Sequence, residues 1–223
     1  MEHTARSDKL LILLVLSALF LLNDFLLIPA KDFVSWVAID YVTRITAIAV
    51  IIVVIRRNVS SPSEFGLKWI GMRQLFIWSL VLTVTGILID QVVWRYFKTI
   101  LPDTQMMSFP QTRNKILNAF DLSVGVALVS ISEELVFRGY FFSVARNYLQ
   151  STTAIVLLSL PLFGLIHWSV GCHATVTTAL WGVLPMVMVA RTGSIYPAII
   201  AHFLTDVVSL SSIVPERWFE FIK

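Results

Sequence analysis

Charged side chains are scarce in this sequence: Asp, Glu, Lys and Arg together make up only 14% of its 223 residues. In a soluble domain, such residues usually account for about a quarter of the chain. Hydrophobic residues account for 57% of the chain, and the mean hydropathy is +0.81. This composition excludes a disordered chain and argues strongly against a soluble globular protein.

Cysteine, glycine and proline are also few. The single cysteine, Cys172, cannot form a disulfide within the chain, which excludes a disulfide scaffold and gives no evidence of an oxidising compartment. The 9 glycines and 8 prolines are too few for a collagen-like fibre. The net charge is +3, but the basic residues are scattered between apolar runs, as membrane-surface anchors are. We therefore expect no nucleic-acid partner.

The most prominent feature of the sequence is a series of long apolar runs. A helix that crosses a bilayer needs about 20 mostly apolar residues. Seven stretches meet this requirement: Leu10–Pro29, Phe33–Ile55, Gln74–Trp94, Ile116–Val144, Thr152–Val170, Ala174–Ala190 and Ser194–Val214. The sequence therefore predicts an all-α polytopic membrane protein, with residues 1–223 forming a single integral-membrane domain.

The number of retained spans depends on the first run and on two connectors. The first run could be a secretory signal peptide, but Asn23 and Asp24 interrupt it and no small-residue cleavage site follows. We therefore expect a retained helix. The two longer connectors, Asn58–Arg73 and Thr99–Lys115, are interpreted as loops.

Ionisable residues inside apolar spans are expensive, and each is a candidate for function. Asp40 and Arg44 are four residues apart, so they share a helix face, and we interpret them as a structural pair. Glu134 and Arg138 have the same spacing and are expected to pair. Glu133 then lacks a partner in its own helix, which makes it the candidate proton acceptor.

Two histidines complete this polar set. His167 lies on the fifth span, and His202 on the seventh has Asp206 one helical turn further on, where a carboxylate can fix the tautomer of the ring. Because isolated polar groups are costly in lipid, we predict that Glu133, His167, His202 and Asp206 face one polar cavity within residues 116–214, the motif-bearing core.

A carboxylate and an imidazole can activate water, while a second imidazole can donate to an oxyanion. Zinc is the alternative, with Glu133, His167 and His202 as its ligands. Zinc-bound histidines are usually braced by a neighbouring acceptor, and His167 has no acidic neighbour nearby in the sequence. We therefore predict a site without metal or other cofactor, in which a carboxylate and an imidazole share a water.

Three motifs resemble those of the CAAX protease and bacteriocin-processing family, also called the type II CAAX prenyl endopeptidase family. They are Glu133-Glu134-Leu135-Val136-Phe137-Arg138, Phe163 with His167, and His202 with Asp206, in the family's order. The resemblance implies a glutamate-dependent intramembrane endopeptidase. Glu133 and His167 would activate water, and His202 and Asp206 would stabilise the oxyanion.

The resemblance also implies supporting roles for Glu134, Arg138 and Phe163. Members of the family usually have about eight helices, which implies a short eighth segment within one of the two long connectors. Asp206 stands where many members have asparagine, and an ionised aspartate is a poor oxyanion donor, so we expect it to orient His202 instead. Expected partners are membrane lipid and a membrane-associated protein or peptide substrate. The compact chain resembles bacterial or archaeal members, which implies a multi-pass protein of a prokaryotic inner or plasma membrane.

Two other functions fit the same residues less well. A non-catalytic scaffold or chaperone of the family would be expected to have lost a motif residue, and none is lost. A proton-coupled carrier also uses intramembrane Glu, His and Asp. Such carriers often contain inverted repeats, and this sequence shows none.

Overall fold

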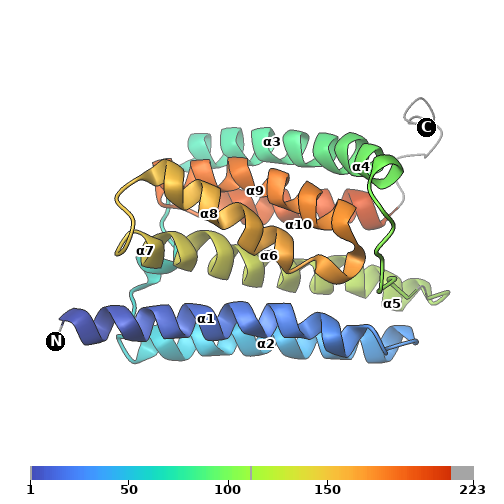
Figure 1. The fold of residues 1–223 in the computed structure, drawn as a ribbon, viewed down its shortest axis with the longest axis horizontal. Coiled ribbons are helices and arrows are strands. Elements are labelled where there is room, and N and C mark those ends of the chain that lie inside the picture. The colour runs from blue at the N-terminus through green and yellow to red at the C-terminus, as the bar shows by residue number, and fades with distance from the viewer. Residues whose placement is uncertain (1, 111, 212–223) are drawn as a thin grey trace.

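The computed structural model describes residues 2–110 and 112–211 (Figure 1). Ten α-helices are found in this part of the chain: α1 (Glu2–Leu27), α2 (Phe33–Arg56), α3 (Met72–Leu88), α4 (Trp94–Ile100), α5 (Lys115–Phe120), α6 (Val126–Glu134), α7 (Phe141–Ala145), α8 (Thr152–Leu165), α9 (Cys172–Thr192) and α10 (Tyr196–Leu210). The described residues contain no strand. The predicted all-α fold is confirmed.

Three widened π-helical turns join some of these helices end to end. The turn η2 (Ile89–Val93) links α3 to α4, so that residues Met72–Ile100 form one continuous helix. The turns η3 (Asp121–Gly125) and η4 (Leu135–Tyr140) link α5, α6 and α7 in the same way. Counted as continuous rods, the described helices are therefore seven, at the positions of the seven predicted spans.

Several boundaries differ from the prediction, and the first helix begins at Glu2 instead of Leu10. The third rod continues to Ile100, past Trp94. The fifth helix ends at Leu165 and is followed by a 3₁₀ turn, η5 (Trp168–Val170), so His167 lies just beyond the helix. Residues 212–214 of the predicted seventh span lie outside the described residues. The two long connectors contain one 3₁₀ turn, η1 (Pro62–Phe65), within their described residues, so no eighth spanning helix is found there.

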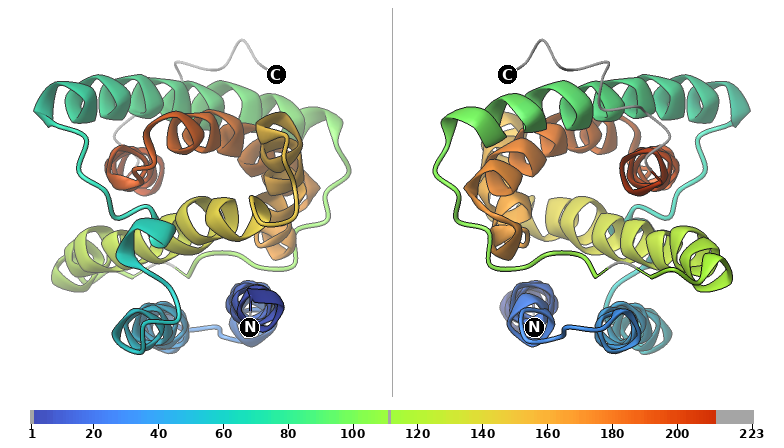
Figure 2. Two further views of the ribbon diagram at one scale, coloured as in Figure 1. Left: turned by 90° about the vertical axis from the view of Figure 1, so that its left-hand side faces the viewer. Right: turned by 90° about the vertical axis from the view of Figure 1, so that its right-hand side faces the viewer.

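The seven rods are arranged in layers. Helices α1 and α2 lie side by side and form one layer, as the end-on views of Figure 2 show. The α5–α7 rod crosses over this pair, and α6 contacts α2 below and α10 above. Helix α10 packs against α3, and α8 packs against α9. The motif-bearing α6 therefore occupies the centre of the molecule.

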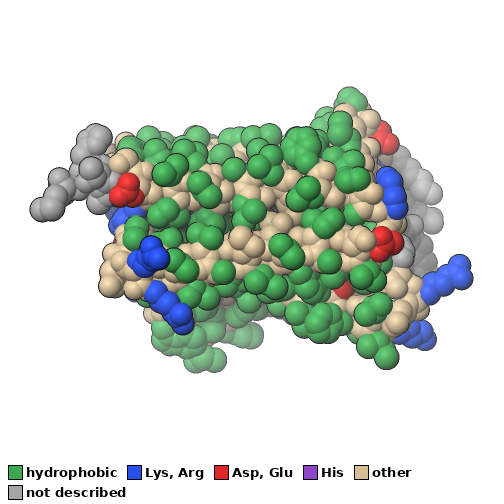
Figure 3. All heavy atoms as spheres, turned by 90° about the horizontal axis from the view of Figure 1, so that it is seen from below, with side chains coloured by type: hydrophobic (Ala, Val, Ile, Leu, Met, Phe, Trp, Pro, Cys, Tyr) green, Lys and Arg blue, Asp and Glu red, His purple; other side chains and the backbone are tan. Residues whose placement is uncertain are grey.

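The outer surface is suited to lipid. Within the described part of the chain, four helices are long and apolar enough to cross a membrane: Arg6–Leu27, Phe33–Arg56, Met72–Ile100 and Cys172–Thr192. On the face formed by α1 and α2, hydrophobic side chains cover the middle while Lys, Arg, Asp and Glu gather toward the two ends (Figure 3). In α1, Leu11, Leu14 and Phe25 are each more than half exposed. This banded pattern is that of a polytopic membrane protein.

Local sequence signals define several helix ends. Asp32 caps α2, where its Oδ1 accepts a hydrogen bond of 2.9 Å from the backbone N–H of Ser35. The backbone and side-chain hydrogen bonds of Ser35 lower the pKa of the Asp32 carboxyl, because they stabilise its charged form. Ser151 caps α8 in the same way, and Gly193 ends α9 in the left-handed conformation.

The connector between α2 and α3 packs closely, backbone against backbone, on the α5–α7 rod. The ring of Phe65 in η1 stacks on Tyr140 at 4.3 Å, with the planes 8° apart. Beside this stack, a Cβ added at Gly139 would collide with the backbone carbonyl of Phe65. Glycine at position 139 therefore allows the connector to lie directly against η4.

We expect Gly139→Ala to destabilise the protein by about 1–3 kcal/mol, the usual cost of overpacking, because the backbone of Phe65 has to move. Gly182→Ala is the matched control. A Cβ at Gly182 meets its nearest atom, on Phe163, at an ordinary 3.5 Å, and Ala is the better helix former. Unfolding in detergent micelles measures both effects. A Gly139→Ala protein as stable as the control would contradict the close approach.

Candidate active site

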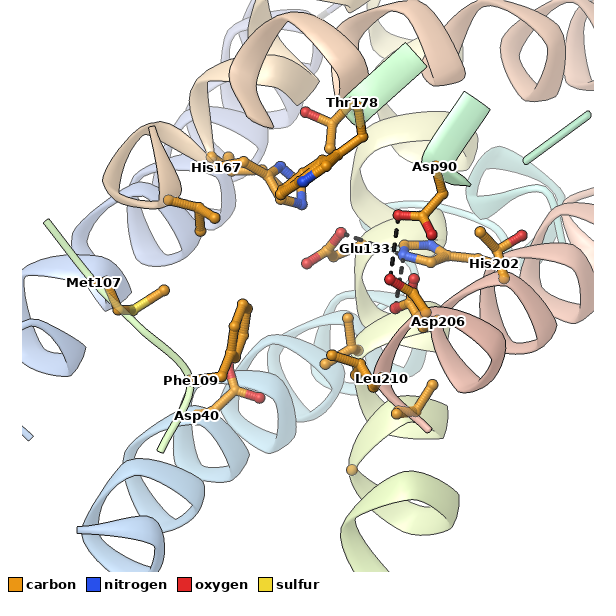
Figure 4. Close-up of a pocket in the computed structure, with 18 of the residues that line it drawn as sticks. Asp40, Asp90, Met107, Phe109, Glu133, His167, Thr178, His202, Asp206 and Leu210 are labelled. Atoms are coloured by element: carbon orange, nitrogen blue, oxygen red, sulfur yellow. Dashed lines mark hydrogen bonds and ion pairs between the residues drawn. The ribbon is translucent and has the colours of Figure 1, made fainter. Parts of the chain in front are cut away.

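A cavity of about 530 Å³ is lined by residues of α1, α2, α6, α9 and α10, among other elements. Its walls combine apolar residues such as Trp36, Phe109 and Leu210 with an unusual number of ionisable side chains. All four predicted catalytic residues line it: Glu133, His167, His202 and Asp206 (Figure 4). The structure therefore brings together residues from α6, the end of α8 and α10, while their chemical roles stay predictions.

Glu133 has one carboxylate oxygen held and one free. The side chain is 2% exposed, at the C-terminal end of α6. Its Oε1 accepts a hydrogen bond of 2.7 Å from Nη1 of Arg44 on α2. Its Oε2 has no hydrogen-bond partner among the described residues. A group that could accept a proton from water is thus present at the cavity wall.

Glu134 is fully buried and points to a different neighbour, as the 100° rotation between adjacent helical residues requires. Its Oε1 lies 3.2 Å from Nη1 of Arg138, which confirms the expected pair. The same oxygen lies 2.9 Å from Nδ1 of His202 on α10. Glu134 therefore connects the motif-bearing rod to the histidine of the seventh helix.

The guanidinium of Arg138 is buried next to two aromatic rings. The Arg138 side chain is 1% exposed, and its Cζ lies 3.4 Å from the ring centroid of Phe163 and 5.1 Å from that of Trp181. Stacking on an aromatic face stabilises a cation away from water. This contact explains how Phe163 can support the site without touching a carboxylate.

His202 lies among three carboxylates. Its Nδ1 contacts Glu134, while its Nε2 lies 3.4 Å from Oδ2 of Asp206 and 3.9 Å from Oε2 of Glu133. We expected Asp206 to orient the ring. The shorter contact, to the buried Glu134, shows that Glu134 is the main brace, and the partly exposed Asp206 is second. The Nε2 edge of the ring is the side that faces Glu133.

His167 reaches the cavity from the opposite side to the Asp40 carboxylate (Figure 4). Its Nδ1 lies 3.1 Å from the backbone carbonyl oxygen of Phe163. A carbonyl oxygen can only accept, so Nδ1 carries the proton in this contact, and Nε2 of a neutral ring keeps its lone pair. The sequence showed no acidic brace for this histidine, and the brace is a backbone group.

Arg44 has a second partner in the site that the sequence did not indicate. Its predicted pair with Asp40 is present, with Nε 3.1 Å from Oδ1. However, the pair does not stand apart from the site, because Arg44 also holds Glu133. An arginine in the middle of an apolar span was the available signal, but sequence spacing cannot show that α2 packs on α6.

The donor set gives little support for a metal. Among residues 2–110 and 112–211, no three His, Cys, Asp or Glu side chains are grouped so as to hold a metal ion. Both nitrogens of His202 and one of His167 already contact protein groups. A zinc ion would need these side chains to turn toward a common point about 2.0–2.2 Å from each ligand atom.

Comparison with known proteins adds one match. Residues 115–208, from α5 to α10, match the model of a family described as Type II CAAX prenyl endopeptidase Rce1-like. No curated protein and no solved structure matches the chain. The matched stretch contains all three motifs identified in the sequence. Residues 115–208 are therefore similar to the Rce1-like family of type II CAAX prenyl endopeptidases, and the predicted resemblance is confirmed.

Proposed function

We propose that the protein is an intramembrane endopeptidase that hydrolyses a peptide bond of a membrane-associated protein or peptide. The observation that carries this proposal is the free Oε2 of Glu133, which is buried at the wall of a cavity shared with two histidines. The family match over the same residues supports it. The cavity lies inside an apolar body, which favours substrates that reside in or on the membrane.

In the proposed reaction, a water lies between Oε2 of Glu133 and Nε2 of His167. Glu133 accepts one proton from this water, and His167 accepts a hydrogen bond from its other O–H. The resulting hydroxide attacks the carbonyl carbon of the peptide bond. Glu133 then passes the proton to the leaving amine as the C–N bond breaks, so that the carboxylate is restored and one water is consumed.

The oxyanion needs a donor, and His202 is placed to be one. Its Nδ1 lies 2.9 Å from Oε1 of Glu134 and its Nε2 lies 3.4 Å from Oδ2 of Asp206, so each ring nitrogen faces a carboxylate oxygen to which an N–H can donate. An N–H at Nε2 can then donate to the developing oxyanion. Asp206 itself acts through His202 in this scheme.

The substrate can be sought directly. Membranes from prokaryotic cells that produce either the wild type or Glu133→Gln are compared for new protein N-termini. Under the proposal, a set of cleavage products is present with the wild type and absent with the variant. Identical N-termini in both samples would contradict a peptidase activity in that membrane and favour a non-catalytic scaffold.

We expect activity to be independent of metal. Purified protein treated with a chelator that works in detergent should keep its cleavage rate, because the proposed water is activated by Glu133 and His167 alone. The check is a cleavage assay before and after chelation, with zinc re-added at one equivalent. Loss of activity on chelation with recovery by zinc would make Glu133 a ligand and overturn the proposed mechanism.

A further inference from the structure

A chain of polar contacts runs from the first helical layer to the candidate catalytic glutamate. Thr43 donates to Oδ1 of Asn23 at 2.6 Å, and Asn23 donates through Nδ2 to Oδ1 of Asp40 at 3.2 Å. The same Asp40 oxygen accepts from Nε of Arg44, whose Nη1 donates to Glu133. Apart from Glu133, these groups belong to α1 and α2, outside the residues that match the family model.

Arg44 is fixed in a way that suits this contact. Its side chain is 11% exposed and that of Asp40 is 4% exposed, so little water competes with the ion pairs. Its Cζ also lies 4.8 Å from the ring centroid of Phe20 on α1. Two edges of one planar guanidinium bridge Asp40 and Glu133, which a lysine ammonium on its flexible stem cannot reproduce.

The consequence for Glu133 is orientation. With Oε1 engaged by Arg44, rotation of the carboxylate is restricted and Oε2 is the oxygen left for water. We propose that Arg44 is a positioning residue for the hydrolytic reaction: it fixes the Glu133 carboxylate from α2 and makes the first helical layer part of the active site. This inference rests on the proposed function.

The test uses the full chain in detergent or nanodiscs and follows kcat and KM separately. Arg44→Lys keeps the charge but not the bridge, and it should lower kcat at least tenfold with little change in KM, since a misplacement of about 1 Å can cost about 100-fold. Arg44→Ala should lower kcat further than Arg44→Lys does, and added guanidinium should restore part of the activity. Asp40→Asn in the Arg44→Ala background removes one stranded carboxylate, so that folding is maintained.

Lys9→Met is the matched control. Lys9 forms an ion pair of 2.6 Å with Glu64, also between the first layer and another element, but neither residue lines the cavity. This variant should keep the wild-type kcat. Wild-type kcat in Arg44→Lys, or an equal loss of kcat in Lys9→Met, would overturn the positioning role.

A second readout separates this inference from the proposed function. The melting temperatures of Arg44→Lys, Glu133→Gln and the double variant form a cycle that measures the contact without any substrate. If the double variant lowers the melting temperature by less than the sum of the two single decreases, Arg44 and Glu133 interact in the folded protein. If they interact but the wild type cleaves nothing, the proposed function fails. If the wild type cleaves while Arg44→Lys is fully active, only the positioning role fails.

Discussion

Glu133→Gln is expected to lower kcat about 100- to 10,000-fold, the range typical for removing a general base. Glutamine keeps the shape of the side chain and an oxygen that can accept from Arg44, but its amide cannot take a proton from water. The fold should persist, because Arg44 retains its pair with Asp40. The measurement is the cleavage rate of the purified variant, with its melting temperature as the check on folding.

A second residue of the same catalytic step tests this prediction, and a residue outside the cavity serves as its control. His167→Ala should be similarly severe, whereas Lys9→Met should be as active as the wild type because its ion pair with Glu64 lies outside the cavity. Near-normal cleavage by well-folded Glu133→Gln would reject Glu133 as the base. Loss of activity in all three variants would point to a general effect on folding instead.

Glu134→Ala should have the largest effect on stability, a loss of about 3–5 kcal/mol, because it leaves the buried Arg138 without its carboxylate. The same change removes the hydrogen-bond partner of His202 Nδ1, so activity should fall as well. The free energy of unfolding in detergent micelles measures the first effect, and kcat measures the second.

The double variant Glu134→Gln with Arg138→Met distinguishes the two effects. Without either charge, no buried ion is left unpaired, and the protein should be more stable than Glu134→Ala. Its activity should stay low, because the carboxylate that braces His202 is still missing. Recovery of both stability and activity would show that Glu134 serves the fold alone.

The sequence was sufficient to predict the helices, because membrane-spanning helices are recognisable as long apolar runs. The predicted start of the second span at Phe33 coincides with the start of α2, which Asp32 caps. The same argument could not find the π-turns or the early end of α8, since neither leaves a pattern in the hydrophobicity. Helix packing decides these features, and packing involves residues far apart in the chain.

The candidate site shows the same division. The spacing of Glu134 and Arg138 within one helix predicted their pair. Contacts between helices could not be predicted from the sequence, because their partners are distant in the chain. Arg44 and Glu133 are 89 residues apart, and Glu134 and His202 are 68 apart. These two contacts change which residue braces which. They turn Asp40–Arg44 from an isolated structural pair into part of the cavity, and they make Glu134 the main partner of His202.

The π-turn η4, which begins directly after Glu134, affects how this rod tolerates a change in length. A π-turn accommodates one extra residue inside a helix, so the α-helical segments on either side keep the faces they would have without it. Loss of one residue within Leu135–Tyr140 converts the bulge to ordinary helix and preserves the direction of Glu133. Loss of one residue from the regular helix of α6 turns everything on one side of it by about 100° and separates Glu133 from Arg44. We therefore expect the protein to tolerate insertions and deletions of one residue in the widened turns of this rod better than in the regular helix of α6.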